Sequence, residues 1–135
     1  MKQTLLLVAA GATLLIGMAY AQGHAELTAA MKTAGAANGS LRKSITAKDA
    51  SDIAATTDKL VAAFKTTQGH FEEHHMDDGV KFAQAGIQAA TNIAAAAKAG
   101  DWDKASAELK TLGAQCQGCH AAHREKLPDG SYKMK

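Results

Sequence analysis

The sequence is short of the residues that interrupt helices. Its one proline, Pro128, lies near the C-terminus, so almost the whole chain is free of proline rings. No alternating polar and apolar pattern typical of strands is present, and neither is a repeat of 20 to 50 residues. Alanine is abundant and β-branched residues are sparse. These features exclude sandwiches, barrels and solenoids and predict a single all-α domain.

Aromatic residues and charge of one sign are also scarce. Three phenylalanines, two tyrosines and one tryptophan leave mostly alanine to fill the core. Small side chains bury little apolar area, so a bundle of this size invites a further group to fill its middle. The formal net charge is only +2. Nucleic acid is therefore not expected as a partner, because phosphate binding needs a basic surface.

The first residues have the pattern of an export signal. Lys2 gives a positive start, residues 4–16 form an apolar run, and Ala19-Tyr20-Ala21 matches an A-x-A cleavage site. We expect residues 1–21 to be a signal peptide and residues 22–135 to be the mature domain. A retained anchor is the alternative, but the run is short for a membrane span. No stable membrane anchor is expected after cleavage.

Apolar spacing predicts four helices, at about residues 25–45, 50–67, 80–99 and from Trp102 toward Pro128. Asp49 or Ser51 is a plausible N-cap for the second helix, Gly100 a C-cap for the third, and Asp101 an N-cap for the fourth. Residues 70–79 are polar and are expected to form a loop or a loose helical turn after Gly69. Short connections make successive helices antiparallel. The expected fold is an antiparallel up-down four-helix bundle.

The expected core faces follow steps of three and four residues. The first helix places Met31 on its stripe, and the fourth helix continues its stripe into two cysteines. The stripe of the first helix is Leu27, Met31, Ala34, Asn38, Leu41 and Ile45. That of the fourth is Trp102, Ala105, Leu109, Leu112, Cys116, Cys119 and His123.

The two cysteines belong to the sequence Cys-Gln-Gly-Cys-His at residues 116–120, the attachment pattern of c-type haem. Residues three and four apart share a helical face, so both thiols can reach the vinyl edges of one porphyrin. His120 then becomes an axial iron ligand. We therefore expect one covalently attached haem c held by Cys116, Cys119 and His120.

Three other uses of the cysteine pair were weighed. A disulfide suits an exported protein. A thiol oxidoreductase places C-x-x-C at the start of a helix in a βαβ unit, whereas these cysteines come several turns into a predicted helix. Zinc needs further ligands at matching spacing, and the chain has no second cysteine pair. The export signal, the adjacent histidine and the position of both cysteines on the apolar stripe of the fourth helix together favour haem.

The late position of residues 116–120, followed by His123 and Arg124, resembles class II c-type cytochromes, the cytochrome c-prime family. The resemblance covers most of residues 25–126 and is strong only at the haem motif. It implies a four-helix bundle around a haem, with His120 as proximal ligand, the first helix on the other side of the iron and Arg124 near the haem. A solvated Arg124 is the plainer alternative.

The sixth iron ligand separates two branches of that family. Met31-Lys32 resembles the low-spin branch, in which a methionine of the first helix completes the coordination. In the other branch a group such as leucine leaves five-coordinate iron that binds small gases. Met31 also lies on the predicted buried stripe, although methionine often fills core gaps without binding metal. The family's Arg-Gln pair before the distal residue is replaced by Leu27 and Thr28, and the aromatic residue before the arginine is replaced by His123.

The expected function is that of a periplasmic mono-haem cytochrome that carries electrons to and from redox partner proteins and is not an enzyme. The alternative is a five-coordinate cytochrome that binds nitric oxide or carbon monoxide. A third hypothesis is a haem-free helical protein that buffers metal. Relatives of this architecture often form homodimers, but no surface of this sequence can be assigned to one.

Residues 70–74 match H-x-x-E-H, an inverted zinc-protease pattern. A chain of this size has no room for the rest of a protease site, so that function is rejected. Adventitious metal binding by His70, His74 and His75 is an alternative to a solvated polar turn, and one of these histidines is also a candidate sixth haem ligand in place of Met31. His24 is expected in a surface tail.

Overall fold

The computed structural model describes the backbone of residues 2–135 and the side chains of residues 24–135. The predicted signal peptide, residues 1–21, thus lies outside the residues with described side chains. Within the described part of the chain, no helix is both long enough and apolar enough to cross a membrane.

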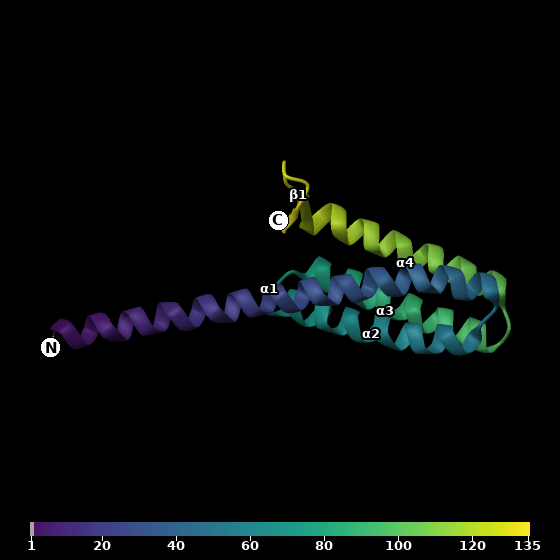
Figure 1. Cartoon of the computed structure of the whole chain (residues 1–135), viewed down its shortest axis with the longest axis horizontal. Helices are drawn as coiled ribbons and strands as arrows, with labels where there is room; N and C mark the ends of the chain where they lie inside the picture. The colour runs from purple at the N-terminus through teal and green to yellow at the C-terminus, as the bar shows by residue number, and fades with distance from the viewer. Residues whose placement is uncertain (1) are drawn as a thin grey trace.

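Four helices and a small hairpin make up the structure, and successive helices pack against each other (Figure 1). Turns at residues 48–49, 74–76 and 99–101 connect the helices. The predicted antiparallel up-down bundle is confirmed. The first and last helices touch each other much less than the sequential pairs do. The elements are α1 (Lys2–Ala47), α2 (Ala50–Glu73), α3 (Asp77–Lys98), α4 (Trp102–His123), β1 (Arg124–Lys126) and β2 (Tyr132–Met134).

The predicted caps at Asp49, Gly100 and Asp101 are confirmed. The Asp49 side chain accepts a hydrogen bond of 2.9 Å from the backbone N–H of Asp52 at the start of α2. Asp101 does the same for Lys104 in α4, at 3.0 Å. Gly100 has a φ of +74°, the left-handed conformation that ends a helix without a Cβ penalty.

The prediction that residues 70–79 form a loop or loose turn was wrong in part, because α2 continues through Gly69 to Glu73. Thr67, His70 and Phe71 continue the buried stripe of the helix at three- and four-residue steps. Burial of the Phe71 ring, which is 2% exposed, outweighs the helix penalty of about 1 kcal/mol for one glycine. Only residues 74–76 form the turn.

The hairpin after α4 was not predicted. β1 and β2 pair antiparallel, with Arg124 opposite Met134 and Lys126 opposite Tyr132. The connection between the strands turns at Asp129 and Gly130: Gly130 has a φ of +85°, and Asp129 accepts a hydrogen bond from the Ser131 N–H. Three-residue strands are too short to show an alternating pattern in a sequence.

The core is built from small side chains packed closely around a few large ones. The side chains below 2% exposure with the greatest volume are Phe71, Leu41, Ile53, Leu60, Ile93 and Leu112. Glycines let α2 and α3 approach: a Cβ built on Gly86 would lie 2.9 Å from the Phe64 ring, and one on Gly79 would overlap the Phe71 ring. α4 contributes only Ala105 and Leu112 as buried residues, so the core is thinnest beneath this helix.

The glycine contact gives a matched pair of tests. Gly86→Ala is expected to lower the free energy of unfolding by about 1–2 kcal/mol, because the new methyl overpacks the Phe64 ring. Gly35→Ala, in an exposed part of α1 with nothing within 4 Å, should instead raise it by roughly 0.5–1 kcal/mol. Urea unfolding followed by circular dichroism measures both; equal effects would contradict the close approach of α2 and α3.

Candidate functional site

The C-terminal half of α4 is the least covered part of the bundle. No residue of α4 after Leu112 is buried, and the helix diverges from its neighbours toward this end (Figure 1). Cys116, Cys119 and His120 lie here, and all three are half-buried while Gln117 is exposed. The motif therefore presents its three chemically important side chains on the partly covered side of the helix.

Met31 and Cys116 belong to the surroundings of one apolar cluster. Both are partly buried and pack against the main core, Met31 from α1 and Cys116 from α4. The structure thus brings the predicted distal residue and the first motif cysteine to the same core from two different helices. Leu27, which precedes Met31 by one turn, is buried, so this face of α1 is apolar as predicted.

α3 approaches the motif at its glycine. A Cβ on Gly118 would lie 2.7 Å from the Phe82 ring, so the side chain of Phe82 lies directly against the motif backbone. Phe82 was not among the predicted site residues. Its position one residue before the buried Ala83 places it at the edge of the α3 core face, where the ring reaches α4.

The environment of the cysteines keeps both thiols protonated. Burial raises the pKa of Cys116 above its usual value. Burial, then Cys116, then the Asp78 carboxylate raise the pKa of Cys119 to about 11. Thiol oxidoreductases need a depressed pKa and use a helix N-terminus to obtain it. Here both thiols are free and lie toward the C-terminal end of α4, so the geometry and the electrostatics disfavour that use.

His120 is held in its neutral form by burial first and then by Arg124, which together lower its pKa. A neutral imidazole has the lone pair that binds a metal ion. Arg124 itself is half-buried, and its guanidinium carbon lies 3.3 Å from the centroid of the Tyr132 ring. The hairpin therefore positions Arg124 through a cation–π contact, and the simple solvated arginine considered above does not describe it.

His123 ties the end of α4 to the bundle. Its Nε2 lies 3.1 Å from Asp78 Oδ2 of α3, an ion-pair distance that lacks the angle of a hydrogen bond. Its ring centroid is 4.9 Å from that of Phe71 in α2. His123 was expected only on the seam of α4, and Asp78 and Phe71 were not assigned to the site. Sequence alone could not pair them, because they come from three helices.

The histidine-rich segment divides between different environments. His70 is buried in α2, His74 is the C-cap of that helix, and His75 is exposed with a φ of +55° in the turn. His75 thus does not share the position of the other two. Among the side chains that the structure describes, no group of three or more histidine, cysteine or carboxylate residues is arranged to hold a metal ion.

Two thiols and one imidazole thus lie on the half-buried side of α4, and a thioether lies on the apolar face of α1 that packs against the same core. This is the set of side chains that attaches and ligates a haem: thiols for the vinyl groups, and histidine and methionine for the iron. A porphyrin also needs apolar contact, which the half-buried faces and the Phe82 ring supply. The residues present fit the group. Against known proteins, no family model and no curated protein matches the chain.

Thiol reactivity tests the electrostatics of the site. In the folded protein without haem, Cys119 should react with iodoacetamide at pH 8 at least tenfold more slowly than in the urea-unfolded chain. Its raised pKa lowers the thiolate fraction by roughly a hundredfold, which the greater nucleophilicity of a basic thiolate offsets only in part. Peptide mapping by mass spectrometry measures the rate. Reaction as fast as in the unfolded chain would show that Cys119 is not shielded.

Proposed function

We propose that the chain is a mono-haem c-type cytochrome of the cytochrome c-prime type that transfers electrons. The observation that carries the proposal is the placement of Cys116, Cys119 and His120 on the half-buried side of the last helix, where the core of the bundle is thinnest. A planar apolar group attached there covers side chains that the protein itself leaves partly exposed.

In this proposal Cys116 and Cys119 hold the haem through thioether bonds, and His120 binds the iron from α4. The haem supplies the reversible one-electron change of its iron. The chain provides the rest: Phe82 packs against the motif backbone, and the apolar faces of α1 and α4 exclude water. A low-dielectric surrounding of this kind tunes the reduction potential.

Met31 supports electron transfer over gas binding. Its side chain is half-buried on the face of α1 that packs against the same core as Cys116, so it is available to complete the iron coordination. The thioether is a ligand of electron-carrying haems and leaves no open position for a gas. A buried histidine from α2 is the other candidate ligand. The ring contacts that the structure describes for His70 are with His24, Phe71 and His74.

The same proposal implies where the protein works and which kind of partner it has. Residues 1–21 would direct export and be removed, and the mature protein would work in the periplasm with redox partner proteins. The Arg124–Tyr132 contact holds one positive charge beside His120. That charge opposes a further positive charge on the iron and thereby favours the reduced state.

Covalent attachment is the first test. Protein exported by a host with haem-maturation machinery should carry the mass of one haem, and acid–acetone should not extract that haem. The Cys116→Ser/Cys119→Ser double variant should carry no covalently attached haem. Gln117→Ala, between the two cysteines but exposed, should keep the haem and is the matched control. A colourless wild-type protein with two free thiols would refute the proposal.

The sixth ligand is the second test. The wild-type optical spectrum should be low-spin and insensitive to carbon monoxide, because Met31 occupies the iron. Met31→Leu, which keeps the volume, should become high-spin and bind carbon monoxide, whereas Met76→Leu, in the turn between α2 and α3, should not. Carbon monoxide binding by the wild type would support the gas-binding alternative. An unchanged spectrum in Met31→Leu would remove Met31 from the iron.

A further inference from the structure

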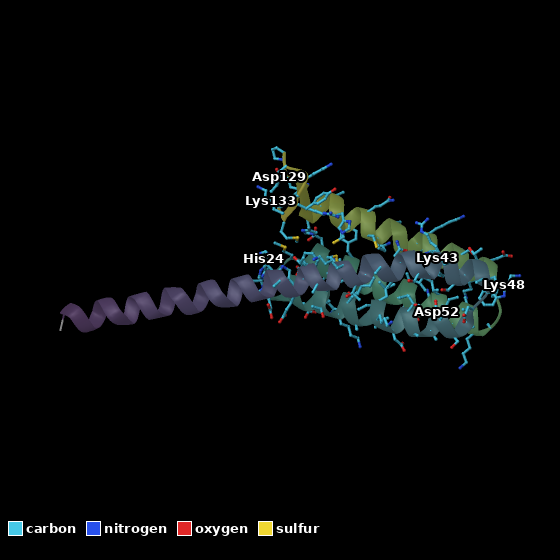
Figure 2. All side chains as sticks on the ribbon, in the orientation of Figure 1. His24, Lys43, Lys48, Asp52, Asp129 and Lys133 are labelled. Carbon is cyan, nitrogen blue, oxygen red and sulfur yellow. The ribbon has the colours of Figure 1, made fainter. Side chains whose placement is uncertain are left out.

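Three imidazole rings meet where α1 enters the bundle and α2 ends. The ring centroids of His70 and His74 are 4.3 Å apart, those of His24 and His70 are 5.6 Å apart, and those of His24 and His74 are 6.3 Å apart. His24 comes from α1, and the other two come from the last turn and the cap of α2. Figure 2 shows His24 at the end of the bundle from which the rest of α1 extends.

His70 is the buried member of this group. Its side chain belongs to a residue only 6% exposed, and its Nδ1 is buried without a hydrogen-bond partner. A buried imidazolium in this position would leave a charged N–H donor without an acceptor. Burying that charged ring costs much more free energy than burying the neutral ring. Burial first, then His74 and His24, lower the pKa of His70, and only Glu73 acts in the opposite direction.

The other elements at this end supply no carboxylate that the structure places against His70. The Phe71 ring contacts both the His70 ring, at a centroid distance of 5.8 Å, and the His123 ring of α4, at 4.9 Å. α3 has two carboxylates at this end: Asp77 is exposed, and Asp78 lies 3.1 Å from His123 Nε2. A protonated His70 would therefore lie beside two imidazoles and an aromatic ring. Glu73 is the group that raises the pKa of His70 and so favours its protonated form.

We propose that His24, His70 and His74 form an acid-sensitive clasp, which holds the first bundled turn of α1 to the end of α2 while His70 is neutral and releases it when His70 is protonated.

The direction in which pH changes the stability of the clasp follows from the difference in proton binding between its closed and open states. An opened end exposes His70, which then takes up a proton near its ordinary value of 6.5, whereas the closed end resists protonation until a lower pH. The clasp is therefore fully stable above about pH 6.5, and its opening equilibrium rises by up to about tenfold per pH unit as the pH falls below that value. Leu27 and Met31 follow His24 within two turns. Opening of this end of α1 is therefore expected to disturb the position of Met31. Only this last consequence rests on the proposed function.

Hydrogen exchange measured by mass spectrometry from pH 5 to pH 8, corrected for intrinsic exchange rates, tests the clasp in the full mature protein. Peptides over residues 24–31 and 66–74 should lose protection below pH 6.5, by up to about tenfold per unit, while residues 93–105 at the opposite end should not. Equal loss in all helices, or none at residues 24–31, would overturn the proposal. This readout follows the backbone, so it is informative whether or not haem is attached.

Two variants separate the clasp from other histidines. His70→Gln, which cannot be protonated, should abolish the pH dependence, and His75→Asn, which removes the exposed imidazole of the neighbouring turn, should keep it. The opposite pattern would contradict the role of His70. If His70→Gln does not fold, an NMR titration of the wild type still decides: a His70 pKa at or above 6.5 in the folded protein would exclude the clasp.

Discussion

Full burial of α4, which stops at Leu112, is the constraint on which the rest of the structure depends. Up to that residue, α4 lies on a core of alanine, leucine and isoleucine supplied by the other helices. Beyond it, α4 has no fully buried residue, and its contacts include the half-buried Cys116 against the core, the Phe82 ring against Gly118 and the His123 pairings. An alanine-rich core buries too little area to cover a fourth helix along its whole length. The cysteines and His120 lie in the part left half-covered.

Partial burial has the same effect on both kinds of titratable group in the site. It disfavours the charged form, so it raises the pKa of the two thiols and lowers the pKa of His120. A site for nucleophilic thiol chemistry needs the opposite arrangement. Neutral thiols and a neutral imidazole beside an apolar core suit a group that is attached once and then held, and this physical contrast favours a haem over a redox-active disulfide.

The two ends of the bundle are stabilised differently. At one end, side-chain caps by Asp49 and Asp101 and the left-handed Gly100 close tight turns. At the other, α1, α2, α3 and α4 are joined through rings and one ion pair: the three-histidine cluster, Phe71 and the His123–Asp78 pair. In the proposed clasp, burial lowers the pKa of His70, so this end, which also carries the cysteine motif, is the one whose packing would respond to acidity.

Local signals in the sequence determined the four helices, their caps and the stripes on which Met31 and Cys116 lie, because periodicity and capping depend on neighbouring residues. The sequence by itself also contains the C-x-x-C-H pattern of the proposed haem site. The chemistry of that pattern requires residues three and four apart on one helix. The continuation of α2 through Gly69 was decided by the tertiary burial of Phe71, which overrides a local helix penalty. Tertiary structure alone brought Phe82 to Gly118, Asp78 to His123 and His24 to His70. These contacts join different helices, and no spacing along the chain encodes which side chains meet when helices pack.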